Sequence, residues 1–219
     1  MAVDTPLTWS VVIPVKVLAL AKSRLAGLDD ADRRALALAM AADTVAAAVA
    51  CPLVGAVVVV SDDPTVAAEV APLGAVAVAD TPGAGLNRAL TAGAEHAAAR
   101  WPGHGLAALL ADLPALSAGE LATALTAAAA TAQAFAADAA GSGTTLYTAR
   151  PGSPFLPQFG PRSRTLHQQA GATELNPPGI SGLRQDVDTL ADLRAAAAIR
   201  LGRRTTALAM ADRVRAGRW

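Results

Sequence analysis

The chain has 219 residues, enough for one substantial hydrophobic core but marginal for two. Hydrophobic residues make up 53% and charged residues 16%, which favours a compact globule over a disordered chain. The formal net charge is zero, so nothing favours a nucleic-acid partner. The single cysteine, Cys51, excludes an internal disulfide and suits a reducing compartment.

The ends and the apolar runs of the chain predict a soluble, cytoplasmic protein with no membrane partner. The first nine residues, MAVDTPLTW, contain an acid and no basic cluster, unlike a secretory signal peptide. The longest uncharged helical run, residues 121–137, is mostly Ala and Thr and is too weakly apolar to cross a bilayer.

Short β-branched runs alternate with Ala- and Leu-rich stretches along the first two thirds of the chain. The strands predicted from the apolar runs cover residues 9–15, 55–61, 75–80, 105–112 and 132–138. The helices predicted between them cover residues 31–50, 64–71, 85–100 and 117–131, the last with a capping box. This alternation predicts a single Rossmann-like α/β domain over residues 1–219, with a mostly parallel sheet and helices on both faces.

The pattern changes after residue 140. Residues 141–178 are rich in Gly, Pro and Ser, and we expect a lid or hairpin insertion over the sheet edge. A last strand is expected at residues 182–188, GLRQDVD, followed by a helix at 190–202. A basic tail is expected at 203–219, loose in structure or a loose helix.

Both lysines of the chain, Lys16 and Lys22, follow the first predicted strand, together with Arg24. All other basic residues are arginine. A compact ammonium group suits polyphosphate, and the loop after the first strand of such a sheet is the usual phosphate position. The alternative is a solvated loop without a role, since neither a Walker motif nor GxGxxG is present.

Acidic residues stand where strands are expected to end. Asp112 closes one predicted strand, and Asp186 and Asp188 stand two apart, so that an extended segment would project both to the same face. Neighbouring carboxylates repel unless a cation lies between them, and oxygen-only ligands indicate Mg²⁺ or Mn²⁺. The alternatives are a helix cap for Asp188 together with Thr189, and a turn residue before proline for Asp112.

Other polar residues give weaker indications. Asn87, after a glycine-rich turn, could cap a helix or contact a nucleotide. The histidines, His96, His104 and His167, have no metal-ligand spacing and are expected at surface or helix positions.

Five stretches occur in a recognisable order between about residues 10 and 204: KVLALAKSRLA, ADLPAL, GSGTTL, FGPRS and LRQDVDTLADL. Together they resemble the guanylyltransferases of deazaflavin coenzyme F420 biosynthesis, whose nucleotide-diphospho-sugar-transferase-like fold is shared with molybdenum-cofactor guanylyltransferases. Many relatives carry DRDGTGT where this chain has DAAGSGT, which keeps only Asp138.

The resemblance implies transfer of GMP from GTP to a phosphorylated three-carbon acid, phosphoenolpyruvate or 2-phospho-L-lactate, with release of pyrophosphate. The Ala- and Arg-rich composition, typical of high-GC bacteria, favours phosphoenolpyruvate. The product would pass to a transferase that joins it to the deazaflavin. The alternatives are another nucleotidyltransferase, acting on molybdopterin or a sugar phosphate, and a non-catalytic GTP-binding protein. The oligomeric state is open, a homodimer included.

The resemblance also implies roles for individual residues. Mg²⁺ would be held by Asp112, Asp186 and Asp188. The phosphates would lie near Lys16, Arg24 and the catalytic Lys22, and the phosphorylated acid would contact Thr144, Gly160 and Ser163. The guanosine half would face Ser61, Asp63 and Asn87.

Overall fold

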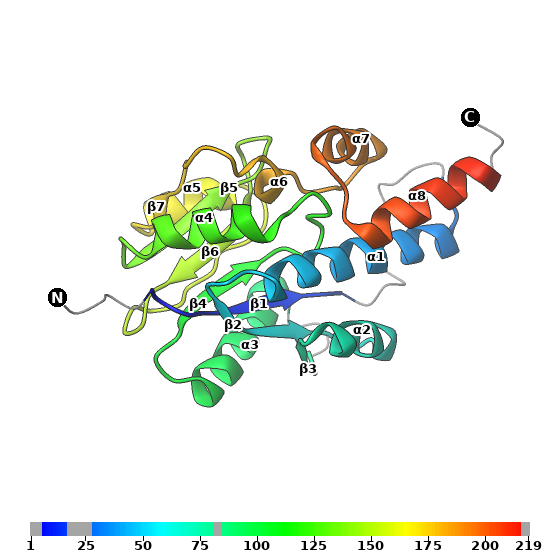
Figure 1. Cartoon of the computed structure of the whole chain (residues 1–219). Coiled ribbons are helices and arrows are strands. Elements are labelled where there is room, and N and C mark those ends of the chain that lie inside the picture. Colours follow the sequence, from blue (N-terminus) through cyan, green and yellow to red (C-terminus); the bar gives the residue numbers. More distant parts are fainter. Residues whose placement is uncertain (1–5, 17–27, 81–84, 216–219) are drawn as a thin grey trace.

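The computed structural model describes residues 6–16, 28–80 and 85–215, with side chains up to residue 210 (Figure 1). The strands are β1 (Trp9–Pro14), β2 (Val54–Val60), β3 (Val76–Val78), β4 (Gly105–Leu109), β5 (Gln133–Ala137), β6 (Thr144–Ala149) and β7 (Thr173–Glu174). The helices are α1 (Asp30–Val49), α2 (Pro64–Val70), α3 (Leu86–Arg100), α4 (Ala118–Ala128), α5 (Ser163–Gln169), α6 (Ser181–Arg184), α7 (Leu190–Ile199) and α8 (Arg203–Arg215), with a 3-10 turn, η2, at Ala71–Leu73.

The strands form one sheet in the order β3-β2-β1-β4-β6-β5-β7. Parallel pairs join β1 to β2, β1 to β4, β2 to β3 and β5 to β7. Only β6 runs in the opposite direction in the described sheet, between β4 and β5. The predicted mostly parallel α/β fold is therefore confirmed.

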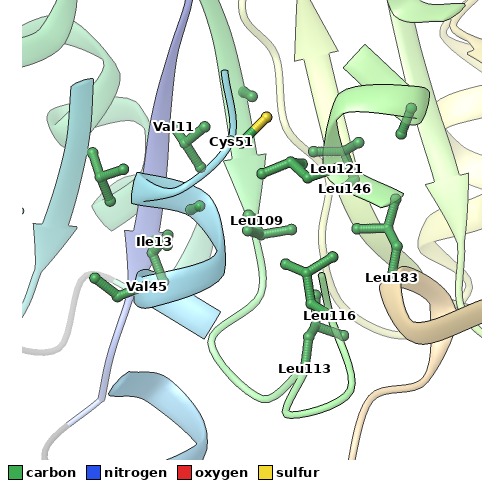
Figure 2. Close-up of a cluster of buried hydrophobic side chains, with 14 of the residues drawn as sticks. Val11, Ile13, Val45, Cys51, Leu109, Leu113, Leu116, Leu121, Leu146 and Leu183 are labelled. Carbon is green, nitrogen blue, oxygen red and sulfur yellow. The ribbon is translucent and has the colours of Figure 1, made fainter. Parts of the chain in front are cut away.

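Alternate residues of the central strands face two separate cores, because successive side chains of a strand point to opposite faces. Val11 and Ile13 of β1 join the core beneath α1 and α4, where Leu109 and Leu121 also lie (Figure 2). Val12 joins the core beneath α3, on the other side of the sheet (Figure 1). Helices thus cover both faces, as the sequence predicts.

The contact between α3 and the sheet is close enough to require glycine. A Cβ at Gly93 would lie 2.5 Å from Val12 Cγ1 and 2.7 Å from Val60 Cγ2. Two helix starts are capped by side chains: Asp29 accepts from the Asp32 amide at α1, and Ser117 and Glu120 form the predicted capping box of α4.

The predicted insertion at 141–178 does not simply cover the sheet edge, which is a correction. Its first part forms β6, an interior strand with every residue buried. The sequence TTLYTA suits a buried strand because it is rich in β-branched and aromatic residues. The Gly and Pro residues on both sides led to the prediction of a loop-rich insertion instead. The remainder supplies α5 and β7.

The strand predicted at 182–188 is also wrong, because this segment begins as helix α6. The Glu120 carboxylate of α4 accepts a hydrogen bond from the Gly182 amide at 2.6 Å, and Leu183 is fully buried. A Cβ at Gly182 would lie 2.2 Å from the Ala115 carbonyl oxygen. These contacts hold the segment as a helical turn against α4. No strand of the described sheet pairs with it.

The expected loose tail is the helix α8, and its first turn is anchored to α1. The buried Asp43 carboxylate accepts hydrogen bonds from the backbone amides of Arg204 and Thr205, at 3.0 and 2.8 Å. A carboxylate that satisfies the first amides of a helix stabilises it. Within the described residues, no helix is long and apolar enough to cross a membrane.

Candidate active site

A cavity of about 790 Å³ opens beyond the carboxyl ends of β1 and β4. From β1 the chain passes through α1 to β2 on one side, and from β4 it passes through α4 to the other side. Ligands of open α/β sheets bind at such a switch point between two neighbouring strands. Stretches far apart in the sequence contribute to the lining of the cavity. They are 14–16, 110–112, 138–144 and 159–163, together with Asp186 and Asp188.

The three predicted acidic ligands meet on one wall. Asp112 follows β4, and Asp186 and Asp188 lie between α6 and α7; all three line the cavity. The Val187 amide donates a hydrogen bond of 3.1 Å to the Asp112 carbonyl, which ties the two segments together. Val187 is fully buried while its neighbours are only half-buried, so the expected alternation holds locally without a strand.

This wall concentrates negative charge. The pKa of Asp186 is raised from 3.8 to about 7, mostly by burial and then by the nearby charges of Asp112, Asp138 and Asp188, in that order of size. An acid with such a pKa, in a cavity beside other acids, is typical of a site that receives a cation or a proton.

The carboxylates share a cavity but are not arranged as a finished metal site. Among the described residues, no three His, Cys, Asp or Glu side chains are placed so that they could hold a metal ion. The convergence predicted from sequence is therefore found, whereas the metal-ligand roles of these aspartates stay predictions.

Asp138 is a cavity residue that the site prediction omitted. It follows β5, and its two oxygens accept hydrogen bonds from the amides of Ser142 and Gly143, at 2.9 and 2.8 Å. A Cβ at Gly143 would lie 2.4 Å from Asp138 Oδ2, so the turn needs glycine there. The available indication was the position of Asp138 at the end of a predicted strand, like Asp112.

The residues predicted to bind the phosphorylated acid line the same cavity. Thr144 begins β6, Ser163 begins α5, and Gly160 lies in the loop before α5. Arg162, which the site prediction also omitted, lines the cavity and is exposed. It is the only non-glycine residue with a positive φ, 60°, in the described part of the chain.

Asn87 holds the loop that carries Gly160. Its side-chain amide donates to the Phe159 carbonyl at 2.9 Å, and its Oδ1 accepts from the Phe159 amide at 2.8 Å. This pair of contacts is neither the helix cap nor the nucleotide contact that the sequence suggested for Asn87. Its predicted contact with guanosine stays a prediction.

The predicted basic residues are only partly described. Lys16 is exposed and lines the cavity, whereas Lys22 and Arg24 lie outside the described residues. Ser61 and Asp63 follow β2 and are absent from the described lining of the cavity.

Local capping accounts for Asp63 but not for Asp188. Asp63 caps α2 by accepting from the Thr65 amide at 2.9 Å. Thr189, together with Asp192, forms the capping box of α7. The cap role considered for Asp188 therefore belongs to Thr189, while the Asp188 side chain lines the cavity.

The protein is thus a mostly parallel α/β fold with a cavity at its switch point, acids along the cavity and a lysine at the end of the first strand. A similar fold occurs in a putative nucleotide-diphospho-sugar transferase from Desulfovibrio desulfuricans G20, with a TM-score of 0.70. That match has 16% sequence identity and covers 93% of this chain and 95% of the other.

Sequence comparison assigns the chain more narrowly. The profile of the family described as "Guanylyl transferase CofC like" matches residues 9–166. A phosphoenolpyruvate guanylyltransferase of Thermomonospora curvata is 57% identical over 206 residues, covering 94% of this chain and 90% of the relative. One from Streptomyces coelicolor is 54% identical over 202 residues, covering 92% and 95%. The chain belongs to the CofC-like guanylyltransferase family, as its motifs predict.

Proposed function

We propose that this protein transfers GMP from GTP to phosphoenolpyruvate, with release of pyrophosphate, in a Mg²⁺-dependent reaction. The observation that carries the proposal is the single cavity in which the acidic residues meet Thr144, Gly160 and Ser163. The names of the two close relatives support phosphoenolpyruvate as the acceptor. The product would be consumed by a transferase that joins it to the deazaflavin of coenzyme F420, and we expect both steps in the cytoplasm.

The proposed chemistry needs no general base. A phosphate oxygen of phosphoenolpyruvate attacks the α-phosphorus of GTP, and the bond from that phosphorus to the oxygen bridging to the β-phosphate breaks. Pyrophosphate leaves with the bonding electron pair. Because the attacking oxygen is already ionised at neutral pH, the site has to align the reactants and neutralise charge. Lys16 at the cavity lining is suited to the phosphates.

The donor set of the acidic wall fits Mg²⁺. Asp112, Asp186 and Asp188 offer only carboxylate oxygens, which this hard cation prefers. Burial, and then the neighbouring carboxylates, raise the pKa of Asp186, and a cation held between these carboxylates would offset their repulsion. Bound there, Mg²⁺ would offset the negative charge that GTP and the acceptor bring into the cavity.

Pyrophosphate release with a panel of substrates tests the proposal. The protein is incubated with Mg²⁺, with each of the four ribonucleoside triphosphates, and with phosphoenolpyruvate, 2-phospho-L-lactate or a sugar 1-phosphate. We expect the highest kcat/KM for GTP with phosphoenolpyruvate. Asp186→Asn should lower kcat by about a hundredfold or more, the loss typical of removing one charge-stabilising group, and keep the native circular dichroism spectrum.

Three outcomes would contradict the proposal or its mechanism. A higher kcat/KM for a sugar 1-phosphate or for another nucleotide would indicate a different nucleotidyltransferase. Tight GTP binding without pyrophosphate release from any acceptor would indicate a non-catalytic GTP-binding protein. Full activity of Asp186→Asn would remove the acidic wall from the mechanism. Glu95→Gln, an exposed carboxylate on α3 outside the described cavity lining, is the matched control.

A further inference from the structure

His167 lies in an aromatic cage behind the cavity. It belongs to α5 and is fully buried. Its ring stacks on Tyr147, with centroids 4.8 Å apart and an interplanar angle of 20°, and on Phe135 at 5.5 Å and 30°. Phe159 meets it edge-on at 5.7 Å. The sequence predicts a surface or helix position for this histidine. It does lie in a helix, but not at the surface.

This cage keeps the imidazole neutral at ordinary pH. Burial lowers the pKa of His167 from 6.5 to about 4, against a smaller opposing effect of a backbone hydrogen bond with Ser163. Tyr147 is the titratable side chain that touches the ring, and burial raises the pKa of its phenol. The ring therefore carries one proton, on one of its two nitrogens.

The backbone decides which nitrogen carries that proton. The Gln158 amide, which can only donate, lies 2.9 Å from His167 Nε2, so Nε2 must accept. The proton is then on Nδ1, which lies 3.0 Å from Thr144 Oγ1 and donates to it. The backbone amide of Gln158 therefore fixes the tautomer of His167. The Thr144 hydroxyl could not, because a hydroxyl can either donate or accept.

The Thr144 hydroxyl consequently has its own proton left to donate. Thr144 is 3% exposed and lines the cavity, on the wall with Gly160 and Ser163. A donated hydrogen bond to an anionic oxygen is about twice as strong as one between neutral groups. Because the Thr144 oxygen accepts from Nδ1–H, the hydroxyl is held in one orientation and its proton does not point back at the ring.

We propose that His167 is a positioning residue for the acceptor: its Nδ1–H donates to Thr144 Oγ1 and so directs the Thr144 hydroxyl proton to an anionic oxygen of the phosphorylated acid. The same ring, through Nε2, holds the Gln158 end of the loop that carries Gly160. One side chain thus joins the strand and the loop that face the acceptor. This inference rests on the proposed function for the identity of the acid.

The tautomer can be read in the wild-type protein. The chain has three histidines, so ¹⁵N-histidine labelling gives three ring systems, and His96→Gln and His104→Gln identify the signals of the other two. We expect His167 to show a protonated Nδ1 and an unprotonated Nε2, unchanged between pH 8 and pH 5. A proton on Nε2, or an imidazolium at pH 7, would overturn the inference.

Steady-state kinetics test the action on the acceptor. Thr144→Val removes the hydroxyl at nearly constant shape, and we expect the KM for phosphoenolpyruvate to rise about tenfold to a hundredfold. The KM for GTP should stay within about twofold, a split that general loss of structure would not produce. Thr144→Ser, which keeps the hydroxyl, should restore most of the acceptor affinity.

Two substitutions of His167 separate its two hydrogen bonds. The amide of His167→Asn reaches the position of Nδ1, so it keeps a donor for Thr144 and should hold the acceptor KM within about threefold of wild type. The amide of His167→Gln reaches the position of Nε2 and should raise the acceptor KM about fivefold to tenfold. In the Thr144→Val background, His167→Gln should add less than about twofold, because the partner is gone.

The controls keep the inference apart from the proposed function. His104→Gln is the matched control, since His104 Nδ1 also bonds a hydroxyl, Ser10 Oγ at 2.9 Å, outside the described cavity lining. Multiplying effects in the double variant, or an unchanged acceptor KM in both single variants, would contradict this inference. A wild type that releases no pyrophosphate contradicts the proposed function instead. If His167→Gln fails to fold, the ¹⁵N measurement of the tautomer and the kinetics of Thr144→Val still test the inference.

Discussion

At the scale of single residues, Asp186 links the charge of the cavity to stability. Its pKa is raised from 3.8 to about 7, so between these pH values the folded protein holds a proton that the unfolded chain has released. The folded state then binds more protons, and the free energy of unfolding must fall as the pH rises through this window. The contribution is fully present below about pH 4 and is lost by about pH 7.

Urea unfolding with EDTA, at half-unit steps from pH 4 to pH 8, measures this dependence. We expect Asp186→Asn to lose the decline, because the neutral amide has no proton to release, and to be more stable than wild type at pH 8. Mg²⁺ added at pH 8 should stabilise wild type more than the variant. Parallel pH profiles for the two proteins would show that Asp186 ionises normally. Glu95→Gln should follow wild type.

At the scale of elements, the Asn87 side chain of α3 holds the loop that carries Gly160. The Asn87 amide uses both its donor and its acceptor on the Phe159 backbone. Two partly buried backbone groups would lose their partners in Asn87→Ala, at a cost to the local closed state of about 1–3 kcal/mol. The first turn of α3 is thereby joined to the loop that carries Gly160.

We expect hydrogen exchange at the Phe159 amide to be about tenfold or more faster in Asn87→Ala than in wild type. The KM for phosphoenolpyruvate should rise, because the loop carries Gly160 and Ser163. Asn176→Ala removes an exposed amide that bonds Arg184 and should change neither quantity. Unchanged protection at Phe159 in the Asn87 variant would show that the loop is held by other contacts.

At the scale of the whole molecule, local patterns were sufficient for the layers and for the elements of the first 138 residues. The continuous apolar runs of β1 and β2 and the caps of α1 and α4 are local, and each element was predicted within a few residues. The failures have long-range causes. β6 is fixed by its neighbours β4 and β5, and the turn at Gly182 by the Glu120 carboxylate of α4.

The site shows the same division. Asp112 could be found because acids at strand ends converge in a parallel sheet, and Asp186 and Asp188 because two carboxylates stand two residues apart, although no strand forms there. Asp138 met the same criterion and was left out of the predicted site. His167 could not be found, because its role depends on a cage of Phe135, Tyr147 and Phe159 that only the fold assembles.

The central claim is that one cavity joins the α-phosphorus of GTP to the phosphate of phosphoenolpyruvate. A ³¹P NMR time course of the protein with both substrates and Mg²⁺ tests it directly. We predict two new, mutually coupled doublets from the diphosphate linkage, growing together with one pyrophosphate resonance. Product signals without phosphorus–phosphorus coupling, or inorganic phosphate in place of pyrophosphate, would contradict the account.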